Sequence, residues 1–237
     1  IEGEKGSGKK MLAEAFAKIL QCEQRKAEQE EACGSCPSCK QMESRNHPDV
    51  IWVNHEKPNI ISVKEVREQI VNTIDVMPYK GPYKIYMIDE AEKMNIAAQN
   101  AVLKTIEEPP SYGIIFLLTT NRGAFLQTIL SRCILLTVKP VPDQEIRKYL
   151  MEHWKIEKTM ADFCVDMSMG NIGKAVDIAL SEDFSKIREF SLSVFPYLHE
   201  LEPYEIAEKV KQLKNEKELI QEFLDMMFMW FRDLLVV

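Results

Sequence analysis

Four of the six cysteines have the spacing of a metal site: Cys22, Cys33, Cys36 and Cys39. The last three form two overlapping C-x-x-C pairs, on a segment that also contains a glycine and a proline. Thiolates are soft ligands that favour zinc, and four of them close a tetrahedral site with no position for a substrate water. The predicted cofactor is therefore a structural Zn²⁺ that pins a loop inserted at residues 22–47.

Other interpretations of this segment stay open at the level of sequence. The four thiols could be unpaired, or they could hold an iron–sulfur cluster. His47 is a possible substitute ligand, but a surface histidine before Pro48 is the simpler interpretation.

A glycine-rich turn near the start of the chain has the pattern of a phosphate-binding loop. Gly3, Gly6, Gly8 and Lys9 lie in it, and helical spacing of apolar residues follows. In such loops backbone N–H groups close on phosphates and the lysine meets the terminal ones. An active loop then has Ser or Thr to hold Mg²⁺, and this chain has Lys10. The pattern predicts that this segment derives from a phosphate-binding loop. It leaves open whether ATP or ADP binds, and it predicts weak or no hydrolysis.

Two acidic residues end the apolar run that begins at Tyr83. Asp89 and Glu90 occupy the position where an ATPase has a magnesium-binding aspartate and a glutamate that polarises water. Asp89 could also cap the helix that is expected to follow. The two roles are compatible. The metal role also needs the Ser or Thr hydroxyl of an active loop, and this chain has Lys10 in that place.

These residues must be positioned by alternating strands and helices. Short apolar runs rich in β-branched and aromatic residues predict strands, and 3.6-residue periodicity predicts helices between them. This alternation indicates a parallel sheet wrapped by helices, an α/β fold. The expected strands are 49–53, 83–89, 114–119 and 133–138, and the expected helices are 11–20, 63–74 and 91–106.

A proline pair at residues 140 and 142 predicts the end of this α/β domain, 1–139. Asp143 is a good N-cap for a helix that starts there. The segment 140–182 reads as a small helical domain, and 183–237 as a second helical domain that stops short. An apolar stripe over 206–237 predicts core or subunit-contact surface there. It consists of Leu219, Phe223, Met226, Met227, Trp230 and Leu234.

Composition and charge exclude several classes of protein. The 237 residues carry a net charge of −7 and are 46% hydrophobic, which is an ordinary globular mixture and not that of a protein that coats nucleic acid. No apolar run is long enough to cross a membrane, so a cytoplasmic location is expected. The chain starts at Ile1 directly before the glycine turn, so we expect it to be a fragment that lacks a preceding strand.

Three motifs in order carry a family resemblance. They are Ile85 to Glu90, then Leu-Lys-Thr-Ile-Glu-Glu-Pro-Pro at 103–110, then Ser131-Arg132-Cys133. Together with the cysteine loop they resemble the clamp-loader subunits of bacterial DNA polymerase III, over residues 1–139. The resemblance implies an AAA+ type P-loop domain with a zinc-loop insertion, followed by a helical lid domain and a helical collar domain.

The resemblance also implies roles for single residues. Arg132 would act as an arginine finger that reaches the ATP site of a neighbouring subunit, since a guanidinium meets phosphate oxygens bidentately. Thr120 or Asn121 would be the first phosphate sensor, and Lys174 takes the place of the arginine in the second. Because the motor subunits of the family have an intact P-loop and that arginine, this sequence is most similar to the delta-prime branch.

The partners implied are the gamma/tau and delta subunits, in a five-membered ring that loads a sliding clamp onto primed DNA. Delta-prime acts as the stator of that ring. An active motor ATPase of the gamma/tau type is the alternative, against which Lys10 and Lys174 speak. A zinc-dependent nucleic-acid-binding module is a third possibility, and the acidic balance weighs against it.

Overall fold

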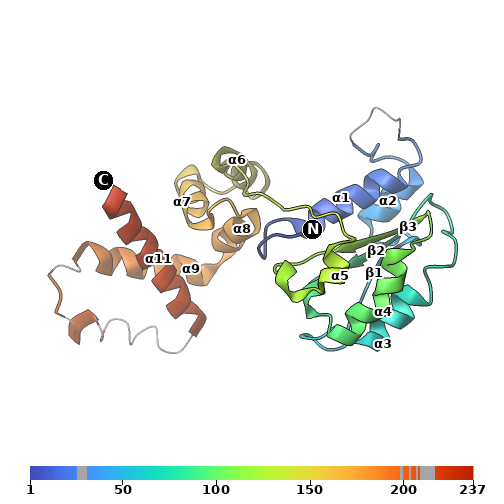
Figure 1. Ribbon diagram of the computed structural model, residues 1–237. Coiled ribbons are helices and arrows are strands. Elements are labelled where there is room, and N and C mark those ends of the chain that lie inside the picture. The colour runs from blue at the N-terminus through green and yellow to red at the C-terminus, as the bar shows by residue number, and fades with distance from the viewer. Residues whose placement is uncertain (26–30, 198–199, 203, 207, 209–216, 237) are drawn as a thin grey trace. The chain divides into compact units, whose positions relative to one another are not determined.

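The computed structural model divides the chain into two compact units, residues 1–139 and 140–237, which are described separately (Figure 1). The structure describes residues 1–25, 31–197, 200–202, 204–206, 208 and 217–236. No helix in this described part combines the length and apolar character needed to cross a membrane.

The first unit is built on a parallel sheet in the order β1-β2-β3. The strands are β1 (Val50–Trp52), β2 (Lys84–Ile88) and β3 (Gly113–Leu117). Every residue of the central strand β2 is buried, as expected for a strand covered on both faces. In a parallel sheet the strands end at one edge, so the residues after β2 and β3 are brought together there.

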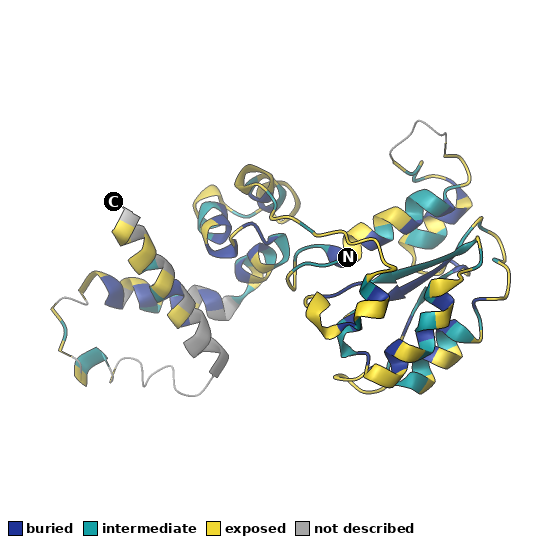
Figure 2. Ribbon diagram, in the orientation of Figure 1, coloured by how far each residue is buried: buried dark blue, intermediate teal, exposed yellow. Residues whose placement is uncertain are grey.

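The chain start continues the sheet beside β3. Glu2 forms parallel bridges to Thr119 on one side and Thr137 on the other. The expected strand 133–138 is wrong in extent, because this segment pairs at Thr137 alone, through hydrogen bonds that join Glu2 to Leu136 and Val138. Most of this segment is exposed (Figure 2). The apolar run therefore does not form the buried strand that was predicted from it.

Helices cover both faces of this sheet (Figure 1). Because side chains alternate along a strand, Ile85 and Met87 of β2 pack against Ala13 and Ala17 of α1 (Lys9–Gln21). Tyr86 and Ile88 face the opposite layer, formed by α3 (Val63–Val66), η1 (Arg67–Val71) and α4 (Ile96–Glu107).

Local signals set where these helices begin. Ser62 and Glu65 form a capping box at α3, and the side chain of Asn95 accepts the N–H of Ala98 to start α4. The helix expected over 63–74 changes to π geometry at Arg67. The helix expected over 91–106 is a 3₁₀ turn, η2 (Ala91–Lys93), followed by α4, because Asn95 supplies a new cap.

The second unit is helical. Its elements are α6 (Asp143–His153), α7 (Lys158–Ser168), α8 (Ile172–Leu180), α9 (Glu182–Val194), η4 (Phe195–Tyr197) and α11 (Lys217–Val236). Pro142 is the N-cap and Asp143 the first helical residue, so the predicted cap is wrong by one position.

One apolar cluster of the second unit contains residues from α6 as well as Phe223 and Met226 of α11. Within the predicted apolar stripe, Phe223 is 4% exposed and belongs to this cluster, whereas Leu234 is exposed. The division of this unit into domains 140–182 and 183–237 stays a prediction. Residues 207, 209–216 and 237 of the expected terminal helix lie outside the described residues.

Candidate functional site

The glycine turn forms a loop that ends at the N-terminus of α1. Gly6 and Gly8 have positive φ angles of 83° and 90°, which favour glycine, and Gly8 is the N-cap without a side-chain hydrogen bond. The Lys9 ammonium donates to the carbonyl oxygens of Gly3 and Glu4, each at 2.7 Å. Burial lowers the pKa of Lys9, and the carboxylates of Glu92 and Asp89 oppose that shift.

The next residue, Lys10, forms an ion pair with the aspartate at the end of β2. Its Nζ lies 2.7 Å from Oδ2 of Asp89. Asp89 therefore has a cationic partner from within the chain, at the position where the loop of an active ATPase has a hydroxyl. Glu90, in the left-handed region at φ 47°, is paired instead with Lys93, at 2.6 Å.

The loop and the strand ends enclose a hollow of about 600 Å³. It is lined by Lys5, Gly6, Gly8, Lys9, Lys10, Met11, Asp89, Glu90, Glu92, Leu118, Thr119 and Thr120. Of the two sensor candidates, Thr120 lines it, whereas Asn121 accepts the N–H of Gly123 with its side chain to start η3 (Arg122–Ala124). Either sensor role stays a prediction.

Sequence reasoning missed Glu92. Its Oε1 accepts the hydroxyl of Thr120 at 2.7 Å, which joins η2 to the end of the β3 strand path. Burial favours the neutral acid, but hydrogen bonds, chiefly that from Thr120, outweigh it and lower the pKa of Glu92. Glu92 lies two residues after Glu90, in the 3₁₀ turn η2. The sequence predicted a continuous helix over 91–106 instead of this turn.

Lys174, the second-sensor candidate, lies in the first turn of α8 in the other unit. Its backbone N–H is capped by the side chain of Asn171, and the residue is exposed. Its predicted contact with phosphate stays a prediction.

A magnesium–nucleotide does not fit the residues present in this loop. Mg²⁺ demands oxygen ligands in near-octahedral geometry. Lys10 supplies none, and its ammonium already contacts the carboxylate that would bind the metal shell. The loop itself keeps the glycines, the backbone donors and Lys9.

The four cysteines do come together. Their sulfur atoms lie within 4.8 Å of one another, beside α2 (Pro37–Glu43). Backbone N–H groups of Cys33, Cys36 and Cys39 donate to the sulfurs of Cys22, Cys33 and Cys36, at 3.3 to 3.4 Å. Such donors favour thiolates, so the donor set fits a tetrahedral zinc site. Residues 26–30 of the predicted insertion lie outside the described residues.

The thiols of this cluster differ in acidity. Backbone N–H donors, first that of Cys36, lower the pKa of Cys33 to about 6, whereas burial raises that of Cys39 to about 12. Bound metal removes the proton from every thiol that it ligates.

His47 is not a ligand of this cluster, and its interpretation as a surface histidine is wrong. It is 4% exposed. Its Nε2 forms a hydrogen bond of 2.8 Å with Oγ of Ser38, and its Nδ1 accepts the N–H of Asp49. The histidine thus fastens α2 to the start of β1. The sequence alone could not show this, because the contact between His47 and Ser38 depends on the path of the chain between them.

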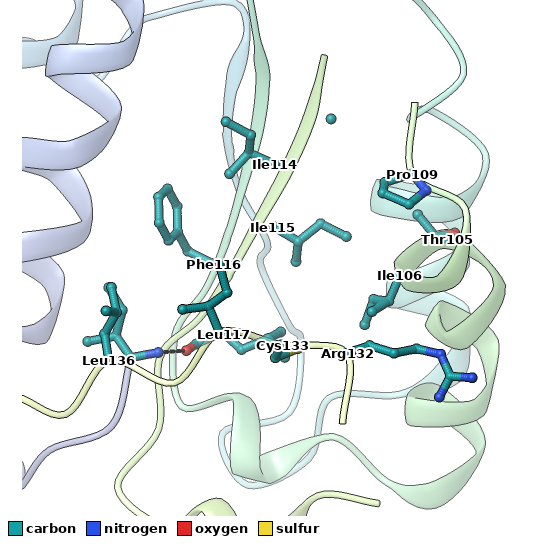
Figure 3. Close-up of a pocket in the computed structure, with 13 residues that line it drawn as sticks. Thr105, Ile106, Pro109, Ile114, Ile115, Phe116, Leu117, Arg132, Cys133 and Leu136 are labelled. Atoms are coloured by element: carbon teal, nitrogen blue, oxygen red, sulfur yellow. Dashed lines mark hydrogen bonds between the residues drawn. The ribbon is translucent and has the colours of Figure 1, made fainter. Parts of the chain in front are cut away.

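Arg132 is exposed, at the end of α5 (Gln127–Leu130). Its Nη2 lies 3.0 Å from Oε1 of Glu107, at the C-terminal end of α4, and its Nη1 donates to the carbonyl oxygen of Thr128 at 2.9 Å. Beside it is an apolar hollow of about 380 Å³ along β3 and α4. Figure 3 shows the guanidinium running away from these apolar residues.

Comparison with known proteins finds one matching family model, "DNA polymerase III, delta subunit", over residues 1–142. The delta' subunit of DNA polymerase III from Bacillus subtilis is 30% identical over 241 residues, which cover 100% of this chain and 71% of that protein. The tau subunit of the same organism is 28% identical over 257 residues, which cover 100% of this chain and 45% of that subunit.

Among solved structures, a gamma subunit-related protein from Thermotoga maritima is 23% identical, with a TM-score of 0.42. The match covers 64% of this chain and 51% of that one, so the chain spans about half the length of this relative. The parallel sheet, the cysteine cluster and the helical second unit confirm the expected α/β fold.

Proposed function

We propose, from the premise that this chain belongs to the DNA polymerase III delta-subunit family, that it is the stator of a clamp loader. It assembles with other subunits of DNA polymerase III, as its similarity to delta' and tau subunits implies. In that complex it helps to load a sliding clamp onto primed DNA, and its location is cytoplasmic.

The ion pair between Lys10 and Asp89 is the observation that carries the stator role. It places a lysine ammonium against the aspartate that a motor subunit uses to hold magnesium. Hydrolysis at this chain's own loop is therefore not its contribution to the complex. In our proposal its contribution lies in a group that acts on a neighbour.

Arg132 is that group in our proposal. It is exposed, its planar guanidinium can meet phosphate oxygens bidentately, and its side chain extends from the surface beside α4. Delivered to the ATP site of a motor subunit, it would stabilise the charge that develops on the transferred phosphoryl group. Such fingers contribute roughly 10³ to 10⁵ in rate.

Glu107 holds the guanidinium when no phosphate does. The pair is exposed on both sides, with 40% and 43% of the two side chains accessible. Exposed pairs contribute about 0 to 1 kcal/mol, so a triphosphate can displace Glu107 from Arg132 at small cost.

Zinc, in this proposal, has a structural role only. Four thiolates fill a tetrahedral shell and leave no open position for chemistry. The metal would join Cys22, at the end of α1, to Cys33, Cys36 and Cys39 at the start of α2, outside the alternation of strands and helices.

The experiment is a comparison of ATP turnover by this chain alone and by the complex reconstituted with motor subunits. We expect turnover only in the complex, and we expect Arg132→Ala in this chain to reduce it. Steady turnover by the purified chain alone would instead support a motor subunit of the gamma/tau type.

A further inference from the structure

We propose that Cys33 and Cys39 are a redox pair, which a peroxide oxidises to a disulfide with release of the zinc ion. The metal keeps its structural role, and the oxidation state of this pair decides whether it is bound. The proposal goes beyond the stator role, which requires no redox chemistry of the cluster. It rests on the unequal burial of the four cysteines, on the hydrogen bonds of their sulfur atoms and on the contacts of α2.

Burial makes Cys33 the first thiol of the cluster that an oxidant in solution meets. Cys33 is exposed and Cys22 is half-buried, whereas Cys36 and Cys39 are 1% and 0% exposed. The Cys33 sulfur accepts the backbone N–H of Cys36 at 3.3 Å and the hydroxyl of Ser35 at 3.6 Å. Such donors stabilise a thiolate, and zinc keeps its ligands deprotonated. Cys33 is therefore an accessible thiolate, which is the nucleophilic form of cysteine.

Cys39 is the thiol that completes the disulfide. Its sulfur lies 3.9 Å from that of Cys33 and is buried, so it can meet Cys33 but not the oxidant. Cys36 is a less suitable partner, because its side chain caps α2 by accepting the N–H of Cys39 at 3.4 Å. Closing 3.9 Å to the S–S bond length of about 2.0 Å requires Cys33 to move, and Cys33 lies before the helix. The cap of α2 then stays in place.

The oxidation has two balanced steps. The Cys33 thiolate attacks one oxygen of hydrogen peroxide, the O–O bond breaks, and the products are a sulfenic acid and hydroxide. The Cys39 thiolate then attacks the sulfenic sulfur, the S–S bond forms, and the S–O bond breaks to release a second hydroxide. The two thiolates lose two electrons in total, and these reduce one peroxide to two hydroxide ions. Two thiolates remain for the metal, which is too few to close a tetrahedral shell.

The contacts of α2 should confine the effect of oxidation to the residues before this helix. His47 joins Ser38 of α2 to the start of β1, and Arg45, just after α2, pairs with Glu14 of α1 at 2.8 Å. Neither contact involves a cysteine. Backbone N–H groups in residues 33–36 donate instead to sulfur atoms of the cluster. Oxidation should therefore loosen residues 33–36 and leave α2 and the sheet in place, so that reduction can restore the site.

The test adds hydrogen peroxide to the zinc-loaded chain and follows zinc release with a chromogenic chelator. The chain carries Cys133→Ser, because Cys133 is an exposed thiol outside the cluster. We expect one zinc ion to be released for each disulfide formed, and peptide mass mapping to place that disulfide between Cys33 and Cys39. Amide exchange should rise at residues 33–36 and not in α2. A thiol reductant with added zinc should reverse all three changes.

Cys33→His separates this redox pair from general oxidation of the cluster. Histidine replaces one cysteine in many structural zinc sites, so the metal should stay bound while the exposed thiol is gone. We expect this variant to keep its zinc at the peroxide concentration that empties the parent chain. Cys22→His is the matched control, because it makes the same ligand exchange and keeps both Cys33 and Cys39. It should lose zinc at the rate of the parent chain.

Three results would overturn the proposal. They are zinc retained at a peroxide concentration that oxidises Cys133 in the wild-type chain, a disulfide mapped mainly to another pair of the cluster, and equal zinc loss in Cys33→His and Cys22→His. If Cys33→His binds no zinc, the disulfide map of the parent chain decides by itself. The stator proposal is tested separately, because these measurements use the chain alone and follow zinc and thiols, not ATP turnover.

Discussion

Arg132 and Glu107 are joined by an ion pair, with 3.0 Å between Nη2 and Oε1. The pair links the Ser-Arg-Cys motif to the Leu-Lys-Thr-Ile-Glu-Glu-Pro-Pro motif, and its two residues are 25 positions apart, at the ends of different helices. Both side chains are partly exposed, so the ion pair holds the guanidinium at the surface and leaves it accessible to solvent. The guanidinium is therefore accessible to another molecule.

Arg132→Ala should leave folding, zinc content and assembly unchanged and should lower the ATPase and clamp-loading rates of the reconstituted complex by roughly 10³ or more. Arg132→Lys should lose most of the effect as well, because lysine keeps the charge but not the bidentate fork. Both rates are measured in complexes with intact motor subunits.

Arg122→Ala is the matched control for that experiment, since Arg122 is also exposed and lies 3.9 Å from a carboxylate of the same chain, Glu2. It should load clamps at the wild-type rate. If both Arg132 variants do so too, the trans role is wrong.

Glu107→Gln should raise the ATPase rate of the complex, by about twofold to fivefold. The reason is that the pair contributes up to about 1 kcal/mol, which must be given up when Arg132 meets a phosphate. Steady-state turnover and the melting temperature of the chain check this together. A fall in turnover at unchanged stability would mean that Glu107 orients the guanidinium and does not compete for it.

The isolated chain should hydrolyse ATP far more slowly than about 1 per second, an ordinary enzyme rate. Lys10 pairs with Asp89 where a metal shell is needed. A phosphate-release assay on the purified chain measures this. Turnover at an ordinary rate would promote the motor interpretation.

One zinc ion per chain is expected in protein purified without chelators, because four sulfur atoms lie within 4.8 Å of one another. Cys36→Ser should remove it and increase amide exchange in the segment 22–47, while the main sheet stays folded. Cys133→Ser, at an exposed cysteine outside the cluster, should keep the metal. Elemental analysis well under one zinc per wild-type chain would contradict the assignment.

Asp49 should make the first unit sensitive to acid. Burial opposes its ionisation, but backbone N–H groups of Tyr79, Lys80 and Gly81 donate to its carboxylate and together lower its pKa. Because the folded-state pKa lies below the unfolded value of about 3.9, the stabilisation is complete above that value and is lost as pH falls through the folded pKa.

Asp49→Asn should therefore cost about 1 to 3 kcal/mol at neutral pH and flatten the pH dependence of unfolding below about pH 4. Denaturant melts at several pH values measure both effects. Parallel curves for the wild type and the variant would show that Asp49 is not the group responsible.

Much of the site could be predicted from local sequence. The cysteine spacing, the glycine loop before an amphipathic helix and the acidic end of a buried strand each depend on residues near one another in the chain. Cys22 to Cys39 and Gly3 to Lys10 are therefore found where the pattern places them. Backbone conformation and short-range ligand geometry are set within such segments, so the sequence alone determined the loop, the cluster and the α/β alternation.

Tertiary structure decided which of these residues meet. Lys10 and Asp89 are 79 residues apart, and Thr120 pairs with Glu92 across 28 residues, because parallel strands end at one sheet edge. His47 is buried and its ring contacts Ser38 of α2, nine residues earlier in the chain. Residues 133–138 pair with Glu2 at one position, and most of them are exposed. Ion pairs and burial depend on the path of the chain between distant segments, and periodicity within one segment does not specify that path.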